Sequence, residues 1–376
     1  MIYFDNAATT KPDRNAVNKA TLFTENKFFN PSALYNEGLD VQSELKNARC
    51  VLLSKIADDL FFEWIFTSCG TESNNQAIFS FAKRGNIVTT AGEHSSVIAP
   101  FTELKNRGVI EMRVAPLTTE GKVNVEKLLE LVDDKTSMVS VMHVNNELGS
   151  INDILTIAKK VKQKNPRVIF HSDGVQAYGK IVFKLSKDID LYSVSAHKIG
   201  GLKGVGGLIK RKSLLLSPYL YGGGQEKGRR SGTENTFGIK QFEYVATAKF
   251  ATLKEDYARL NTYKTTLAEG LDPDVYKVLS PKDGSPYILT VSAVGLRGEV
   301  LLHMANDKGL IVGTGSACSS NSKLRYSKVV LSAGFDESTA DGMLRLSFSP
   351  STTEEEVKQA IQILNEIGRD LKRRMR

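Results

Sequence analysis

Short apolar runs alternate with amphipathic helical patterns along most of this 376-residue chain, and no other feature constrains the fold as strongly. Strands of four to eight apolar residues that alternate with helices are typical of a sheet whose strands run mostly parallel. The alternation therefore predicts an α/β fold with a mostly parallel sheet. The predicted strands are 61–68, 86–92, 136–144, 167–173 and 190–196, and helical patterns between them include 71–84 and 153–164.

The C-terminal part of the chain has a different pattern. Thr353 and Glu356 form a capping box at the start of a helix, and apolar residues 357, 360, 361, 364 and 367 share one face of it. A long helical stretch over 241–269 could join two parts of the chain. We therefore predict a large domain over 14–250 and a smaller α+β domain made of 1–13 and 251–376.

Composition excludes several classes of protein. The net charge of +8 is modest for this length, and no aromatic-rich basic motif predicts nucleic-acid binding. The basic segment 369–376 is interpreted as a solvated helix end. No signal peptide and no run long enough to cross a bilayer is found, so a cytoplasmic protein is expected. Three cysteines do not suggest a disulfide framework, and no metal site is expected.

The segment TSCGTESNN, residues 67–75, places a glycine between a predicted strand and a predicted helix. Gly70 breaks the strand and the helix begins at Thr71, so unpaired backbone N–H groups and a hydroxyl face outward. This arrangement suits a phosphate. Strand–glycine–helix turns are nevertheless common and most bind nothing, so both interpretations stay open.

Two residues with reactive side chains end successive predicted strands, where ligands sit in open α/β sheets. Asp173 is either a catalytic acid or an N-cap, and Lys198 stands directly before a glycine-rich run in SAHKIGGLKGVGG. A lysine amine can hold an aldehyde cofactor as a Schiff base, and a carboxylate can keep its pyridinium nitrogen protonated. Ser195 and His197 could donate to a phosphate, and His94 could stack on a flat ring. A surface lysine, a capping aspartate and structural histidines are the alternatives.

Cys318 lies in GTGSACSSNS, residues 313–322, a flexible composition with no core to bury. It is either a small loop residue or an accessible thiol whose reactivity depends on thiolate formation. Cys50 and Cys69 are expected to pack. Arg345 stands within an apolar run, so a carboxylate partner from substrate or protein is expected.

Together these motifs resemble the cysteine desulfurases of the NifS/IscS type, which are pyridoxal-phosphate enzymes of the class V aminotransferase superfamily with PLP fold type I. The resemblance runs nearly end to end. It is carried by YFDNAATT, NPSALYNEG, TSCGTESNN, GEHSSV, HVNNELG, HSDGVQ, SAHKIGGLKGVGG, GGGQEKGRRSGTEN and GTGSACSS, in that order.

The resemblance implies roles for single residues. Lys198 would be the Schiff-base lysine, Asp173 the pyridinium partner and Cys318 the nucleophile. Gln176 would hydrogen-bond the phenolic oxygen of the cofactor, and His94 would stack on its ring as a catalytic residue. Further contacts with the cofactor are implied for Gly70, Thr71, Asn146, Ser195 and His197 and, across a homodimer, for Thr233, while Asn146 and Arg345 would bind the substrate carboxylate.

The implied reaction converts L-cysteine to L-alanine and leaves a persulfide on Cys318. The sulfur would then pass to an acceptor protein, an iron–sulfur scaffold or a tRNA-thiolating enzyme. Transamination is a rival reaction, but it needs no thiol, so the GSACSS segment argues against it. Selenocysteine lyase activity stays open, and a non-catalytic sulfur-delivery scaffold is disfavoured because the reactive residues are retained.

The chain departs from the family pattern at three places. Tyr35 stands where histidine is common. Ser172 and Gly174 stand where valine and alanine are usual, which would remove a methyl group near the cofactor. The segment KLRYSKVVLSAG lacks the usual Pro-Ser pair. These departures affect expectations about loop geometry, rate and partner choice, but they remove no chemical group from the implied mechanism.

Overall fold

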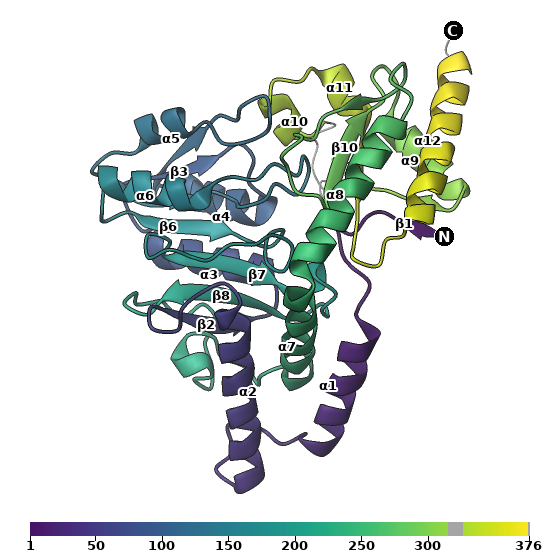
Figure 1. The fold of residues 1–376 in the computed structure, drawn as a ribbon. Helices are drawn as coiled ribbons and strands as arrows, with labels where there is room; N and C mark the ends of the chain where they lie inside the picture. The colour runs from purple at the N-terminus through teal and green to yellow at the C-terminus, as the bar shows by residue number, and fades with distance from the viewer. Residues whose placement is uncertain (315–325, 375–376) are drawn as a thin grey trace.

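The structure, a computed structural model, describes residues 1–314 and 326–374. Figure 1 shows a large sheet covered by helices, with a smaller sheet and its helices packed at one end. None of the helices in the described part of the chain is long and apolar enough to cross a membrane. The predicted domain bounds, 14–250 against 1–13 and 251–376, stay a prediction.

Within the described residues, seven strands form the large sheet, in the order β2-β8-β7-β6-β5-β3-β4. Only β8 runs antiparallel to its neighbours, β2 and β7, and the remaining neighbouring pairs are parallel. The prediction of a mostly parallel sheet is confirmed, and each of the five predicted strands is present. The strands are β2 (Phe62–Thr67), β3 (Asn86–Thr90), β4 (Glu111–Ala115), β5 (Thr136–Ser140), β6 (Ile169–Asp173), β7 (Leu191–Ser195) and β8 (Gly206–Arg211).

Both faces of this sheet are buried. Successive side chains of each strand point to opposite faces, so neighbouring residues belong to different apolar clusters. Ile87 and Met138 belong to one apolar cluster with α3 and α4 residues, whereas Val88 and Val139 belong to the cluster on the other face. This is why the strands read as continuous apolar runs. The helices of this region are α1 (Arg14–Asn26), α2 (Asn36–Ser54), α3 (Gly70–Phe81), α4 (Ser95–Asn106), α5 (Val125–Leu131), α6 (Ile154–Lys164) and α7 (Thr236–Ala251).

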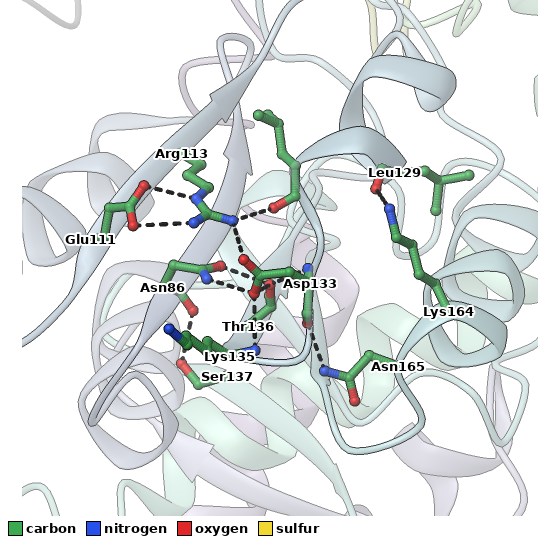
Figure 2. Close-up of polar contacts among 11 residues, drawn as sticks. Asn86, Glu111, Arg113, Leu129, Asp133, Lys135, Thr136, Ser137, Lys164 and Asn165 are labelled. Atoms are coloured by element: carbon green, nitrogen blue, oxygen red, sulfur yellow. Dashed lines mark hydrogen bonds and ion pairs between the residues drawn. The ribbon is translucent and has the colours of Figure 1, made fainter.

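The carboxylate of Asp133 ties the amino-terminal ends of β3 and β5 to Arg113 in the middle of β4 (Figure 2). Its oxygens accept hydrogen bonds from Asn86 Nδ2 at 2.8 Å and from Arg113 Nη1 at 2.7 Å, and also from Lys135 N and Thr136 Oγ1. These donors, led by Asn86 and Arg113, hold the pKa of Asp133 well below its usual range. The cluster therefore fixes the register of three strands at the edge opposite their carboxyl ends.

The smaller region has its own sheets and core. β10 lies antiparallel between β9 and β12, and β1 pairs in parallel with β11. Ile2 and Phe4 of the N-terminal segment pack into this core with Leu260, Leu344 and Leu364. Its elements are β1 (Ile2–Tyr3), α8 (Leu253–Gly270), β9 (Lys277–Val278), β10 (Ile288–Ser292), α9 (Gly298–Asp307), β11 (Leu310–Ile311), α10 (Lys328–Ser332), α11 (Glu337–Asp341), β12 (Met343–Ser347) and α12 (Glu354–Arg374).

The stretch predicted as helical over 241–269 consists of parts of two helices and not of one. α7 ends at Ala251 and α8 begins at Leu253, with Thr252 between them as the N-cap residue of α8. Thr252 Oγ1 donates to Asp256 in the first turn of α8, at 2.8 Å. The break lets α7 pack on the large sheet while α8 packs in the smaller core.

The predicted capping box of the last helix is confirmed. Thr353 N donates to Glu356 Oε2 at 2.9 Å, and Glu356 N donates to Thr353 Oγ1 at 3.2 Å. Val357, Ala360 and Leu364, on the apolar face of this helix, are fully buried, as the sequence pattern predicts.

Candidate active site

A pocket of about 120 Å³ opens at the carboxyl ends of β6 and β7, beside the start of α3. This is the edge of an α/β sheet at which ligands are expected. The structure brings ten of the predicted site residues to its walls. They are Gly70, Thr71, His94, Asn146, Asp173, Gln176, Ser195, His197, Lys198 and Arg345.

Two further predicted site residues are not among those that line this pocket in the described part of the chain. Thr233 is exposed on the segment before α7 and does not line the pocket. Cys318 lies outside the described residues. A larger pocket, of about 750 Å³, lies between the starts of α6 and α8 and contains none of the predicted residues.

The Asp173 carboxylate at the end of β6 is buried and receives two hydrogen bonds. Asn74 Nδ2 donates to Oδ2 at 2.7 Å, and Val175 N donates to Oδ1 at 2.9 Å. These two donors fix the orientation of the carboxylate. The sequence analysis missed Asn74. An asparagine inside a helix is a poor helix former, and this is the signal that could have singled it out.

His94 caps α4, and its ring is held by Ser96. Ser96 N donates to His94 Nδ1 at 3.1 Å, and Ser96 Oγ lies 2.8 Å from the same nitrogen. Because a backbone N–H can only donate, Nδ1 is an acceptor. Ser96 Oγ also accepts from Asn74 Nδ2, at 2.8 Å, so Ser96 and Asn74 connect His94 to Asp173. Burial lowers the pKa of His94, and the charges of Lys198 and Arg345 act in the same direction.

Lys198 lies in the short 3₁₀ turn η1 (Ala196–Lys198) that follows β7. Its Nζ donates to the backbone oxygens of Ala7 and Ala8, each at 2.7 Å. The neighbouring His197 Nδ1 lies 3.1 Å from Thr9 Oγ1, and burial lowers the pKa of His197 to about 4. The N-terminal segment thus forms one wall of the pocket, a contribution that the strand-end argument did not predict.

The start of α3 forms the end of the pocket nearest Ser195. The Ser195 hydroxyl is buried and has no hydrogen-bond partner among residues 1–314 and 326–374. Gly70 allows the Val175 side chain to lie close to the start of α3, because a Cβ at position 70 would lie 2.7 Å from Val175 Cγ2. An orphaned hydroxyl beside the N–H groups of a helix start fits a phosphate group.

Neither Cys50 nor Cys69 is buried, so the expectation that both pack is wrong. Cys50 is exposed on α2. Cys69 is half-buried and lines the pocket directly before α3, with Sγ 3.6 Å from Ser68 Oγ. Cys69 is the N-cap residue of α3 and borders the pocket, so its side chain is only partly covered.

Arg345 on β12 crosses from the smaller region into the pocket and is only 2% exposed. Nη2 lies 2.8 Å from Asp5 Oδ1, and Nη1 donates to Asn146 O at 3.0 Å. The expected carboxylate partner therefore exists and comes from the protein. Arg345 Nε has no partner within the described part of the chain, so the guanidinium keeps a donor for a further acceptor.

The described residues contain no group of three or more His, Cys, Asp or Glu side chains arranged to hold a metal ion. The pocket instead combines an amine, a buried carboxylate, an orphaned hydroxyl at a helix start and a buried guanidinium. This donor set fits a phosphorylated aldehyde cofactor with a ring nitrogen, together with an amino-acid carboxylate.

Comparisons with known proteins agree with this site. The family model for aminotransferase class V matches residues 2–360. The chain is 37% identical to the NifS/IcsS protein homolog of Lactobacillus delbrueckii subsp. bulgaricus, over 98% of this chain and 97% of that one. It is 36% identical to the cysteine desulfurase IscS of Clostridium botulinum, over 98% and 94%.

A solved structure of a NifS-like protein superposes with a TM-score of 0.89 at 32% identity, covering 97% of this chain and 98% of that one. The predicted fold type I of PLP-dependent enzymes is thereby confirmed. The chain belongs to the class V aminotransferase family, in its NifS/IscS group of cysteine desulfurases.

Proposed function

We propose that this protein is a PLP-dependent cysteine desulfurase that converts L-cysteine to L-alanine and transfers the sulfur to Cys318. One observation carries the proposal. Lys198, the hydrogen-bonded Asp173 and the orphaned Ser195 hydroxyl converge in one pocket with the buried Arg345. The family membership supports the same reaction.

The pocket residues divide between the two ends of the proposed cofactor. Lys198 would bind its aldehyde carbon, Asp173 its ring nitrogen and Gln176 its phenolic oxygen, while His94 would stack on the ring. The phosphate contacts are assigned to the start of α3 and to the residues around η1, namely Gly70, Thr71, Ser195 and His197. When bound, pyridoxal phosphate withdraws electrons from the α-carbon of an amino acid attached to it.

The chain's own residues supply the remaining chemistry. Arg345 and Asn146 would orient the substrate carboxylate, and the Lys198 amine, once released, can accept a proton from the α-carbon. The Cys318 thiolate would attack the substrate sulfur. The Cβ–S bond of the substrate breaks and an S–S bond forms, so alanine and an enzyme persulfide result without an external oxidant.

A homodimer completes the proposal. The segment that carries the exposed Thr233 also exposes Leu215 and Tyr221, which are 90% and 85% accessible. Large apolar side chains exposed together favour a protein contact, and a second copy would bring Thr233 to the phosphate end of the partner's pocket.

A thiol-based reaction suits a reducing compartment, so we place the protein in the cytoplasm. An acceptor protein, such as an iron–sulfur scaffold or a tRNA-thiolating enzyme, would receive the sulfur.

The first experiment measures alanine and sulfide formed from L-cysteine in the presence of a thiol reductant. We expect the two products in equal amounts. Lys198→Ala should lower turnover by at least about a hundredfold, the minimum expected for a positioned acid–base group. Cys318→Ala should still bind pyridoxal phosphate and cysteine but should release no sulfide, whereas Cys50→Ala on the exposed face of α2 should behave like the unchanged protein.

Two outcomes would contradict the proposal. Full sulfide production by the Cys318→Ala protein would remove that cysteine from the reaction. Alanine formation from selenocysteine alone, with no product from cysteine, would instead identify a selenocysteine lyase.

A further inference from the structure

Lys180 is a buried cation that the proposed reaction leaves without a role. It follows β6, in the turn that leads away from Asp173, and is only 4% exposed. Within residues 1–314 and 326–374, no carboxylate forms an ion pair with it, and its one side-chain hydrogen bond is to Gln176. A buried ammonium without a carboxylate destabilises the fold, so its retention calls for an explanation.

The backbone brings Lys180 and Gln176 to the same side of one helical turn. Tyr178 N donates to Gly174 O and Ile181 N to Ala177 O, which gives this segment the spacing of a helix. Side chains four residues apart are then neighbours. Lys180 Nζ donates to Gln176 Oε1 at 2.7 Å, and the Tyr287 ring centroid lies 5.6 Å from Nζ, close enough for a cation–π contact.

The two ends of the Gln176 amide face different partners. Its oxygen accepts from Lys180 Nζ, and Lys180 in its ammonium form can only donate. Its nitrogen donates to Ala7 O at 2.9 Å, the same oxygen that accepts from Lys198. An amide nitrogen carries two hydrogens, so among the described residues one hydrogen of Gln176 Nε2 has no acceptor and is available to a ligand in the pocket that Gln176 lines.

The electrostatics place Lys180 beside the same pocket. Burial lowers the pKa of Lys180 to about 7, and the positive charges of Lys198 and Arg345 contribute in the same direction. The charge of Lys180 also acts on His197. Lys180 therefore belongs to the electrostatic surroundings of the site although it does not line the pocket.

We propose that Lys180 is a positioning residue that holds the Gln176 amide with its nitrogen toward the pocket, so that Gln176 offers a donor and not an acceptor to the phenolic oxygen of the cofactor. The inference rests on the proposed function, because it assigns the cofactor to this pocket. An amide free to rotate could present either its oxygen or its nitrogen. Lys180 removes that choice before the cofactor arrives.

The first test measures the affinity of the cofactor-free protein for pyridoxal phosphate and the absorbance of the bound form. Lys180→Met, similar in size but without charge or donor, should weaken binding about tenfold, the scale of one charge-assisted hydrogen bond. In a Gln176→Leu background, the same substitution should change binding by less than about twofold, since the two residues act as one unit.

Lys264→Met is the matched control. Lys264 on α8 is also buried, but its Nζ donates to the backbone oxygens of Pro281 and Ser285 and contacts none of the pocket residues. This variant should lower thermal stability and leave affinity and absorbance unchanged. The inference would be overturned if Lys180→Met, like Lys264→Met, left affinity and absorbance unchanged. It would also be overturned if the loss of affinity caused by Lys180→Met were equally large in the Gln176→Leu background.

A second comparison keeps Lys180 in place and so does not depend on whether Lys180→Met folds. If the amide nitrogen faces the cofactor, Gln176→Glu puts a carboxylate oxygen there and should weaken binding more than Gln176→Leu does. If the amide oxygen faces the cofactor, the order reverses and the inference fails. Absence of pyridoxal phosphate binding by the unchanged protein would instead refute the proposed function itself.

Discussion

The ring of Tyr192 fills the space next to Gly174, and this contact explains one departure from the family pattern. A Cβ on Gly174 would lie 1.9 Å from Tyr192 Cζ and 2.2 Å from its hydroxyl oxygen, a severe overlap. Tyr192 is fully buried, and its hydroxyl lies 2.9 Å from His143 Nδ1. The missing methyl group would therefore have pointed toward Tyr192 and not into the pocket, contrary to the expectation from the sequence.

Gly174→Ala should destabilise the protein by about 1–3 kcal/mol, because overpacking displaces a buried ring. Urea denaturation measures this loss. In a Tyr192→Leu background, which removes the ring, the alanine should cost at least about 1 kcal/mol less. Gly223→Ala is the control, because the three atoms nearest to its Cβ would all belong to the flexible Gln225 side chain. Equal losses from Gly174→Ala in both backgrounds would mean that another contact excludes the methyl group.

Glu93 should make stability depend on pH. It is buried behind the pocket, its Oε1 accepts from Met142 N at 2.7 Å, and Oε2 has no partner among the described residues. Burial raises the pKa of Glu93 to about 8 from an ordinary value of 4.5. Between these two values the folded carboxyl keeps a proton that the unfolded one releases, so its contribution to stability falls as pH rises and is fully lost above about 8.

Glu93→Gln keeps the side chain neutral at every pH. The free energy of unfolding of this variant should therefore rise relative to the unchanged protein between pH 5 and 8, by at most about 1.4 kcal/mol per pH unit, and the difference should level off above pH 8. Glu25→Gln, on an exposed position of α1, should show no such trend. If the free energies of unfolding of Glu93→Gln and the unchanged protein differ by a constant amount between pH 5 and 8, Glu93 is ionised in the folded protein.

Reactive residues were predictable where their chemistry is unusual for their position. Asp173 ends a strand, Lys198 follows one directly in η1, and Arg345 interrupts an apolar run, so each is visible in the sequence. Asn74 and Lys180 were not found, because each acts through another side chain and not through its own reactivity. Only the fold places Asn74 against Asp173, 99 residues away along the chain.

At the scale of elements, the segment between β8 and α7 is fastened to the large sheet by Glu226. This residue has a positive φ of 51°, and its side chain is 4% exposed. Both its oxygens pair with Arg49 on α2, at 2.6 and 2.8 Å, and Phe66 N of β2 donates to it at 3.1 Å. Arg230, four residues later, pairs with Glu72 on α3. These contacts hold the part of the chain that carries Thr233.

Glu226→Ala should destabilise the protein by about 3–5 kcal/mol, because it leaves the half-buried Arg49 without a carboxylate partner and the Phe66 amide without its acceptor. It should also lower activity, since the Thr233 segment loses an anchor. Chemical denaturation and the alanine assay measure the two effects. Lys212→Ala, exposed after β8, is the control and should stay within about 0.5 kcal/mol. A stable Glu226→Ala protein would show that Arg230 alone fixes the segment.

Elements with strong local patterns were predicted well, and those defined by distant contacts were not. The capping box fixed the start of α12, and the apolar runs identified β2, β3, β5, β6 and β7. β8 was missed because Gly206 and Gly207 weaken its pattern. The reason for these glycines is tertiary, since a Cβ on Gly207 would lie 2.3 Å from the Trp64 ring. The short pair β1 and β11 joins segments about 300 residues apart, beyond any local signal.

At the scale of the whole molecule, the proposed homodimer should depend on the segment that exposes Tyr221. Tyr221→Asp puts a charge into the expected contact and should raise the dimer dissociation constant at least tenfold, as loss of a buried interface tyrosine commonly does. Sedimentation equilibrium measures this. Val278→Asp, exposed on β9 of the smaller region, should leave the dimer intact. If the unchanged protein is monomeric, there is no such dimer. If the Tyr221→Asp protein dimerises with equal affinity, the contact lies elsewhere.

The N-terminal wall of the pocket has a consequence for biosynthesis. Residues 2–8 depend on partners from the far end of the chain: β1 pairs with β11, and Ala7 N donates to Ser347 Oγ at 2.8 Å. A ribosome adding about 5–20 residues per second needs roughly 15–60 seconds to go from residue 2 to residue 310. During that interval the first strand has left the ribosome without its partner, and Lys198 has been made before the wall that positions it can form. The nascent chain therefore cannot begin sulfur chemistry until its synthesis is nearly finished.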